Sequence, residues 1–308
     1  MNAMEKLNQK ILETNCRIVA GLDPTIQIVP ECLKSVNKPE DQRRSEMRYS
    51  EAKALERFCK GYVSAIAGIV PAVKMNSAFF EEEHLQPIYR QVAEYARKMG
   101  LFVIGDLKRA DIGSTSKAYA EAWIGEDSPF DAITINPYFG TDGVWPFIEM
   151  AAQNGKGVFV LVKTSNKSSA ELQDKVIAET QRPLYQEVAL LVKQWGEKVA
   201  DDYRYNPVGA VVGATHPKEA EILRELMPNT MFLVPGYGAQ GATAKDVAVN
   251  FDKDGLGAIV NSSRGIMCAY QKEKYAADFV KENGEGWKDA IKKACMDAKA
   301  DINAGLNL

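Results

Sequence analysis

Two aspartates and a lysine stand close together in one short segment of this sequence. Asp106, Lys108 and Asp111 fall in the run Gly-Asp-Leu-Lys-Arg-Ala-Asp-Ile-Gly-Ser-Thr, which ends at Thr115. Asp106 and Lys108 are two residues apart, and side chains at that spacing in a β-strand lie on the same face. A neighbouring carboxylate keeps the Lys108 amine protonated, so we expect Lys108 to donate a proton rather than to act as a nucleophile.

A second lysine, Lys74, follows another apolar run and can bring a second cation beside Asp106. A row of alternating lysine and aspartate side chains loses hydration when it is buried. The attraction between opposite charges, roughly 4 kcal/mol per pair at about 4 Å and an effective dielectric near 20, helps to offset that loss. In the alternative interpretation Asp111 caps a helix and Lys108 is a surface cation. We favour the catalytic interpretation because Asp106 and Lys108 share a face at a strand end.

Two glycine-rich segments, 235–242 and 261–265, predict a phosphate site. The first contains Gln240 and the second contains Arg264. Glycines leave backbone N–H groups open to a phosphate, and an arginine adds a bidentate cation. Each segment alone is typical of a turn, but barrels often bind phosphate between the loops that follow their last two strands.

Several weaker candidates remain. Asp23 precedes Pro24 and either accepts a hydrogen bond from a sugar hydroxyl or forms a turn. Residues 164–166, Thr-Ser-Asn, offer hydroxyl and amide groups that could bind the edge of a base. His84 and His216 are the only histidines and show no metal-ligand spacing, so we expect both to be structural.

Short apolar runs separated by helical segments must position these residues. Near-continuous apolar runs indicate parallel strands that are buried on both faces, and the stretch from Glu81 to Met99 has helical periodicity. Polar or glycine-rich residues follow every run, as in a barrel, whereas a doubly wound sheet would concentrate them at one switch point. The sequence therefore predicts one (β/α)₈ TIM barrel over residues 1–308. The eight runs are 17–22, 68–73, 101–105, 132–135, 157–162, 208–212, 231–234 and 257–260.

Two connections are long enough to be insertions in the barrel. The connection near 34–58 is rich in charge and is expected to be an exposed helical insertion with a solvated face. The connection at 167–201 is expected to hold a loop and a helix that ends near Gly196. No linker or low-complexity tract separates the strands, which favours a single domain.

Composition excludes several classes of protein. The 308 residues include 38 Lys and Arg against 41 Asp and Glu, which lacks the basic excess of a nucleic-acid-binding protein. Five scattered cysteines without a CxxC pair suggest neither a zinc site nor a disulfide framework, and free thiols fit the cytoplasm. No apolar run approaches the ~18 residues of a membrane span, and the first residues lack the apolar stretch of a secretory signal.

These motifs in this order resemble the orotidine 5′-phosphate decarboxylase family in its longer bacterial form, from about Arg17 to Met267. The segment from Asp106 to Thr115 resembles the family's D-x-K-x-x-D signature. Lys74 takes the place of the family's strand-two lysine. Segment 235–241 resembles its phosphate-lid motif, and 263–265 resembles the site of its phosphate-binding arginine.

The resemblance implies the conversion of orotidine 5′-monophosphate to uridine 5′-monophosphate and CO₂, the last step of pyrimidine synthesis, without a cofactor. It implies that Lys108 protonates the carbanion left at C6 and that Asp106 lies near the departing carboxylate. It also implies a homodimer, in which Asp111 and Thr115 reach into the site of the partner subunit.

The remaining implied contacts hold the substrate. Asp23 and Lys74 would hold the ribose hydroxyls, and Ser165 would hold the pyrimidine edge. Gln240 and Arg264 would bind the phosphate. Two alternatives stay open: a magnesium-dependent sugar-phosphate decarboxylase or synthase of the same superfamily, and a non-catalytic barrel that only binds nucleotide phosphates.

Overall fold

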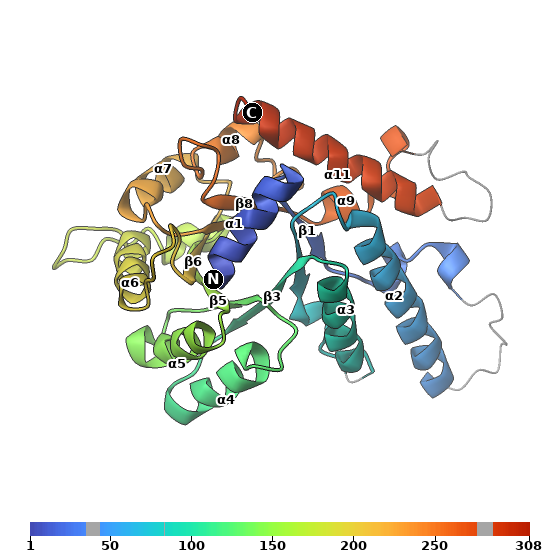
Figure 1. Cartoon of the computed structure of the whole chain (residues 1–308), viewed down its shortest axis with the longest axis horizontal. Helices are drawn as coiled ribbons and strands as arrows, with labels where there is room; N and C mark the ends of the chain where they lie inside the picture. Colours follow the sequence, from blue (N-terminus) through green and yellow to red (C-terminus); the bar gives the residue numbers. More distant parts are fainter. Residues whose placement is uncertain (35–43, 83, 276–285) are drawn as a thin grey trace.

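Eight parallel strands close into a barrel in the order of the sequence, with β1 paired to both β2 and β8 (Figure 1). This computed structural model describes residues 1–34, 44–82, 84–275 and 286–308. The predicted TIM barrel is therefore confirmed. The strands are β1 (Ile18–Leu22), β2 (Ala72–Asn76), β3 (Phe102–Arg109), β4 (Ala132–Ile135), β5 (Gly157–Lys163), β6 (Val208–Val212), β7 (Phe232–Val234) and β8 (Ala258–Ser262).

Helices surround the strands, and Figure 1 shows them around the barrel. The predicted helix at 81–99 begins only at Gln86, because Pro87 fits the first turn of a helix and not its interior. The described α-helices are α1 (Ala3–Thr14), α2 (Arg44–Ile66), α3 (Gln86–Lys98), α4 (Gly113–Ile124), α5 (Gly140–Gln153), α6 (Leu184–Lys198), α7 (Pro217–Leu226), α8 (Ala244–Ala248), α9 (Arg264–Met267) and α11 (Gly286–Gly305).

Two strands differ from their predicted bounds in a way that affects the site. The run expected at 68–73 starts as a turn, in which Gly68 has a φ of +75°, and β2 begins only at Ala72. β3 extends to Arg109 rather than ending near residue 105. Lys74, Asp106 and Lys108 therefore lie inside strands instead of following them. A strand end predicted from the last apolar residue comes too early where the strand continues with polar residues that face a cavity.

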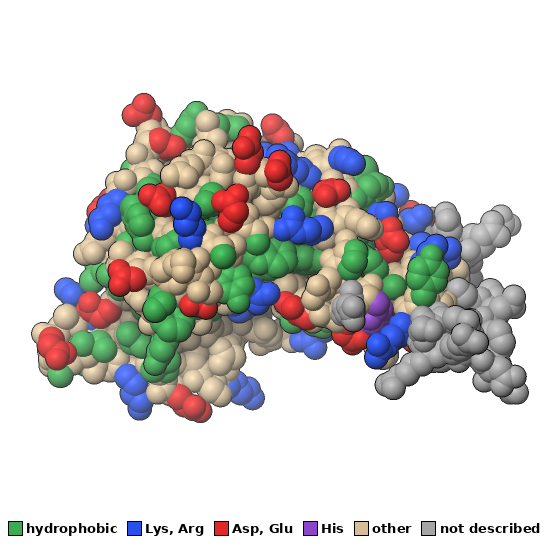
Figure 2. Space-filling view, turned by 90° about the horizontal axis from the view of Figure 1, so that it is seen from below, with side chains coloured by type: hydrophobic (Ala, Val, Ile, Leu, Met, Phe, Trp, Pro, Cys, Tyr) green, Lys and Arg blue, Asp and Glu red, His purple; other side chains and the backbone are tan. Residues whose placement is uncertain are grey.

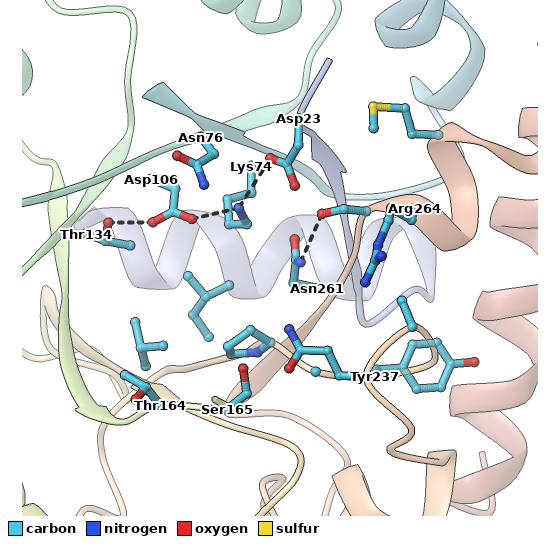
Figure 3. A pocket seen from close by; sticks show the side chains of 18 of the residues that line it. Asp23, Lys74, Asn76, Asp106, Thr134, Thr164, Ser165, Tyr237, Asn261 and Arg264 are labelled. Carbon is cyan, nitrogen blue, oxygen red and sulfur yellow. Dashed lines mark hydrogen bonds and ion pairs between the residues drawn. The ribbon is translucent and has the colours of Figure 1, made fainter. Parts of the chain in front are cut away.

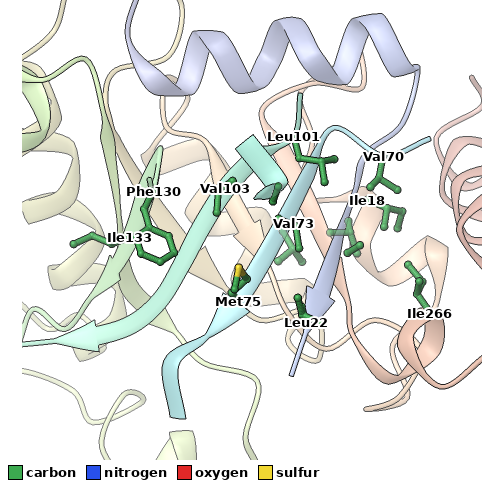
Figure 4. Packing of buried hydrophobic residues seen from close by; sticks show 14 of the residues in the cluster. Ile18, Leu22, Val70, Val73, Met75, Leu101, Val103, Phe130, Ile133 and Ile266 are labelled. Atoms are coloured by element: carbon green, nitrogen blue, oxygen red, sulfur yellow. The ribbon is translucent and has the colours of Figure 1, made fainter. Parts of the chain in front are cut away.

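Side chains on the strands alternate between two apolar layers. Val73, Met75 and Val103 point outward and pack in one cluster with the surrounding helices (Figure 4). Ala72 and Phe102 belong to a second cluster that fills the barrel interior. This alternation is what a closed barrel needs, because successive residues of a strand face opposite sides.

α1 closes the amino-terminal end of the barrel, a role that the sequence did not predict. Met4, Leu7 and Ile11 are fully buried and belong to the interior cluster. The Met4 side chain lies against Gly157 at the start of β5, where an added Cβ would come within 2.7 Å of it. In Figure 1 this helix crosses the barrel in front of the strands.

The two expected insertions form parts of the barrel wall. Residues 35–43 lie outside the described part of the chain, and from Arg44 the chain forms α2. Leu55 and Phe58 are buried, so this part of the segment packs against the barrel and does not present only a solvated face. The second connection holds a 3₁₀ turn at Lys167–Glu171 and then α6, which ends at Lys198, close to the predicted end at Gly196.

Acidic and basic side chains are interspersed over the face of the molecule shown in Figure 2. In the described part of the chain, no helix combines the length and the apolar character that a membrane crossing requires.

Candidate active site

The inward positions of β2 and β3 change from apolar to charged toward the carboxyl ends of the strands. Ala72 and Phe102 fill the interior, and the inward residues further along are Lys74 and Asp106. In the register of the two strands Lys74 pairs with Ile104 and Asn76 pairs with Asp106, so Asp106 lies one inward position nearer the carboxyl ends than Lys74. The alternation of the strands therefore delivers charge to the mouth of the barrel.

Asp106 lies between the two lysines. Its Oδ2 accepts a hydrogen bond from Lys74 Nζ at 2.8 Å, and its Oδ1 accepts one from Lys108 Nζ at 2.5 Å. Thr134 on β4 donates to the same Oδ1 at 2.9 Å. Asp23 extends the row, with its Oδ1 3.9 Å from Lys74 Nζ. Figure 3 shows Thr134, Asp106, Lys74 and Asp23 in sequence across one side of the cavity.

Opposite charges control ionisation within this row. Burial of the Asp106 carboxyl acts to raise its pKa, but the charges of Lys74 and Lys108 and their hydrogen bonds outweigh burial and hold the pKa well below its usual value. Burial acts to lower the pKa of Lys74, and the charges of Asp106 and Asp23 outweigh it, so that pKa lies above its usual value. Asp106 is therefore an anion and Lys74 a cation at neutral pH.

The backbone at Lys108 has a conformation that non-glycine residues seldom adopt. Its φ is +49°, and the register between β3 and β4 shifts between Gly105 and Arg109. The Lys108 N–H leaves the normal ladder and donates to Thr134 Oγ1 at 3.0 Å. Such an irregularity re-aims a side chain, and strain of this kind clusters at functional sites. Lys108 is about half-exposed, whereas the Asp106 side chain beside it is buried.

A cavity of about 710 Å³ opens above this row at the carboxyl ends of the strands. Its floor is apolar and includes the inward residues Leu161, Val211 and Leu233. Seven of the nine predicted site residues line it. These are Asp23, Lys74, Asp106, Lys108, Ser165, Gln240 and Arg264.

The other two predicted residues, Asp111 and Thr115, do not line the cavity of their own chain. Thr115 is exposed on the first turn of α4, and Asp111 is partly exposed just before it. The N-cap of α4 is Ile112 rather than Asp111, so the capping alternative for Asp111 is wrong.

The far end of the cavity is formed by the segments after β7 and β8. Gly236, Gly238 and Gly241 have φ values of +112°, +70° and +98°, which leave the backbone of this loop open to a close ligand. Arg264 begins the short helix α9 and is exposed, and its side chain forms no ion pair or hydrogen bond with the described residues. Its guanidinium is available to an anion.

Two buried acceptor atoms in the cavity wall have no hydrogen-bond donor within the described part of the chain. They are Oδ1 of Asp23 and Oδ1 of Asn261. A buried acceptor without a donor is unfavourable by about 1–3 kcal/mol, so a ligand hydroxyl at this point would be stabilised.

Sequence reasoning missed Asn76 and Thr134, which also line the cavity. Asn76 lies two residues after Lys74 in the same strand, so the two-residue period of a strand extended past Lys74 would have found it. The sequence gives no such signal for Thr134, because its contacts with Asp106 and Lys108 depend on the register shift in the neighbouring strand β3. Nδ1 of His84 lies 3.6 Å from Oε2 of Glu82, and the described residues contain no group of three or more His, Cys, Asp or Glu side chains placed to hold a metal.

Comparisons with known proteins agree with this geometry. The model of the orotidine 5′-phosphate decarboxylase / HUMPS family matches residues 18–279. A protein of Rhodopirellula baltica named orotidine 5′-phosphate decarboxylase is 40% identical over 98% of this chain and 99% of its own length. A protein of the same name from Caldicellulosiruptor bescii is 38% identical over the full length of both chains.

The solved structure of Leishmania donovani OMP decarboxylase superimposes with a TM-score of 0.71 at 26% identity, over all of both chains. The family match covers most of the chain, and the relatives align from end to end. The chain therefore belongs to the orotidine 5′-phosphate decarboxylase / HUMPS family.

Proposed function

We propose that this protein converts orotidine 5′-monophosphate to uridine 5′-monophosphate and CO₂, the closing step of pyrimidine biosynthesis. The observation that carries the proposal is the position of Asp106, hydrogen-bonded to Lys74 and to Lys108 at the mouth of the barrel. The full-length relatives named orotidine 5′-phosphate decarboxylase support the same reaction.

In the proposed mechanism the bond between C6 and the carboxylate breaks, and its electron pair stays on C6. CO₂ leaves, and a proton from Lys108 Nζ forms the new C6–H bond. No carbonyl of the ring is placed to delocalise the electron pair, so the transition state depends on a cation that is already in position. Asp106 positions that cation, because its Oδ1 holds Lys108 Nζ at 2.5 Å.

Asp106 has a second proposed role toward the substrate. Its carboxylate stays ionised, and the substrate carboxylate would lie beside it. Contacts to the distant phosphate can offset this repulsion, and the repulsion is relieved when CO₂ leaves.

The rest of the cavity supports a matching substrate position. Arg264 and Gln240 lie at the end where the glycine loop offers backbone N–H groups, and we assign the phosphate to that end. Asp23, with its buried acceptor, and Lys74 would hold the ribose hydroxyls. Ser165, across the cavity from the charged row, would hold the pyrimidine edge (Figure 3).

The reaction is tested by following the absorbance change as orotidine 5′-monophosphate is consumed, with and without exhaustive chelator treatment. We expect full activity in both. Activity that is lost with chelator and restored by magnesium would instead assign the chain to the magnesium-dependent branch of the superfamily. Tight nucleotide binding without any turnover would leave only the non-catalytic barrel.

We further propose that two copies form a homodimer through the surface between α4 and α5. Tyr138 is 78% exposed and Ile112 is 55% exposed, a large apolar area to leave in water. Phe139, Ile112 and Trp145 also line a hollow of about 540 Å³. Asp111 and Thr115 lie next to Ile112, so a two-fold contact here would carry them toward the partner's cavity.

The dimer is tested by mixing two inactive variants, Lys108→Ala and Asp111→Ala. A mixed dimer has one site with neither residue and one site with both. Random mixing makes about half of the dimers mixed, so co-refolding should recover about a quarter of the wild-type activity. Recovery near zero, with mixed dimers shown to form, would remove Asp111 from the partner's site.

A further inference from the structure

We propose that Asn166 is a specificity-determining residue, whose amide NH₂ donates a hydrogen bond to the 4-carbonyl oxygen of the pyrimidine. Gln173 is its positioning residue and acts through Thr164. The inference rests on the proposed function, because the ring in question is that of orotidine 5′-monophosphate.

The orientation of the Gln173 amide is fixed by the backbone. Its Oε1 accepts from the Thr164 backbone N–H at 3.0 Å, and a backbone N–H can only donate. The other end of the amide is therefore NH₂, and it donates to Thr164 Oγ1 at 2.8 Å.

The next contact runs from Thr164 to Asn166. Thr164 Oγ1 accepts from Gln173, so its single hydrogen is free for the neighbouring contact, which is to Asn166 Oδ1 at 2.6 Å. The carbonyl oxygen of Asn166 is thereby occupied. The NH₂ group is the part of the Asn166 side chain left for a ligand, and Asn166 lines the cavity.

The Gln173 end of this relay is held in place. The backbone N–H of Gln173 donates to Ser169 O at 2.8 Å, and its carbonyl accepts from Tyr185 N at 3.0 Å. Next to it, Asp174 forms an ion pair with Lys163, whose side chain is fully buried at the end of β5. These contacts tie the connection between β5 and α6 to the barrel.

The segment that carries Asn166 is fixed from the opposite side as well. Thr215 Oγ1 donates to Ser165 O at 3.1 Å. Gly213 approaches so closely that an added Cβ would lie 2.8 Å from the Ser165 backbone. Figure 3 shows Thr164 and Ser165 together on one side of the cavity, facing Lys74 and Asp106. An NH₂ donor of Asn166 that is held on this side of the cavity can distinguish one edge of a pyrimidine ring from another.

Uracil and cytosine rings differ at the edge that Asn166 would meet. The 4-position of uracil is a carbonyl acceptor, which an NH₂ donor satisfies. The 4-position of cytosine is an amino donor, and two donors facing each other leave both without a partner. The relay therefore favours the uracil edge and rejects the cytosine edge.

The test measures the dissociation constants of uridine 5′-monophosphate and cytidine 5′-monophosphate by calorimetry, after the decarboxylase activity of the wild type has been assayed. Asn166→Asp replaces the donor with an acceptor. We expect it to lower the preference for the uridine nucleotide by about 10-fold or more. Ribose 5-phosphate has no base, so its affinity should not change.

Gln173→Glu tests the relay itself. The glutamate keeps an acceptor for Thr164 N–H, but its second oxygen competes for the Thr164 hydroxyl hydrogen and releases Asn166 to turn. We expect the uridine preference to fall by about 3- to 10-fold. Gln181→Glu is the matched control, because Gln181 is an exposed residue of the same connection and the charge change is the same.

Two results would overturn the inference. One is an Asn166→Asp protein with the wild-type ratio of the two dissociation constants. The other is a Gln173→Glu protein that matches Gln181→Glu. A wild type that consumes no orotidine 5′-monophosphate would defeat the proposed function, whereas an active wild type with unchanged ratios in both variants would defeat only the inference about Asn166 and its relay.

Discussion

Lys74 at the mouth of the barrel and Lys156 at its opposite end are both buried lysines with different partners. Lys74 is paired with carboxylates, Asp106 at 2.8 Å and Asp23 at 3.9 Å. The Lys156 ammonium instead donates to backbone carbonyls beyond the end of α4, among them Ser128 O at 2.8 Å. The carboxylates at the mouth keep the buried Lys74 ammonium charged. At the amino-terminal end, the dipoles of backbone carbonyls offset the loss of hydration of the Lys156 ammonium less well.

The pKa values follow this difference. The pKa of Lys74 is raised, because the carboxylates outweigh burial. Burial, followed by the charge of Arg97, lowers the pKa of Lys156 to about 8 despite the opposing charges of Asp131 and Asp127. The carboxyl-terminal mouth of the barrel concentrates charge for chemistry. The amino-terminal end, with α1 packed across it, contributes mainly to stability. Four substitutions test that division.

Lys108→Ala, at the mouth, should have the largest effect. Removal of the proton donor and of the cation beside C6 should lower kcat by about 10⁴-fold or more, with product affinity still measurable and little change in unfolding. Steady-state kinetics and calorimetry with uridine 5′-monophosphate measure the two quantities. Lys98→Ala, at the exposed end of α3, is the control and should keep full activity. Near-normal turnover in Lys108→Ala would defeat the assignment.

Leu7→Ala, in α1 at the amino-terminal end of the barrel, should change stability and leave activity unchanged. Leu7 is fully buried, so its truncation should lower the free energy of unfolding by about 2–5 kcal/mol, while KM and kcat below the unfolding transition stay unchanged. Leu12→Ala, in the same helix at a position that is 55% exposed, should change stability by about 0.5 kcal/mol at most. Urea unfolding followed by circular dichroism makes the comparison. A large change of KM in Leu7→Ala would contradict the division of roles.

Arg264→Ala returns to the mouth, at its phosphate end. Loss of one charge-assisted contact should weaken binding of uridine 5′-monophosphate by about 10- to 100-fold. Binding of uridine, which has no phosphate, should change little. Equal losses for the nucleotide and the nucleoside would place Arg264 outside the phosphate site.

Lys156→Met should have the smallest effect and one confined to alkaline pH. The pKa of Lys156 falls from 10.5 to about 8 on folding. Between those values the unfolded chain binds more protons at this residue, so its contribution to the free energy of unfolding rises with pH. We expect a rise of about 1–2 kcal/mol, after allowance for solvent screening, that the variant lacks. Urea titrations of both proteins at about pH 7 and about pH 10 measure it, and parallel pH profiles would contradict it.

The sequence predicts the barrel and much of the site because both depend on local periodicity. Apolar runs mark strands, and polar residues at their ends mark the mouth, which is enough to find Lys74, Asp106 and Arg264. α1 is missed because its burial depends on an end of the barrel that exists only after closure. The left-handed backbone of Lys108 is missed for a related reason, since it depends on the register of the neighbouring strand.

The pairing of β1 with β8 has a consequence for how the chain is made. Ile18 pairs with Val260, so the two strands that close the barrel are joined across almost the whole sequence. During synthesis Lys74, Asp106 and Lys108 emerge long before this contact can form. Until β8 emerges, β1 has an unpaired edge, which is a template for association with other chains. Closure is also the strand pairing of greatest sequence separation in the barrel, and contacts of high sequence separation slow folding.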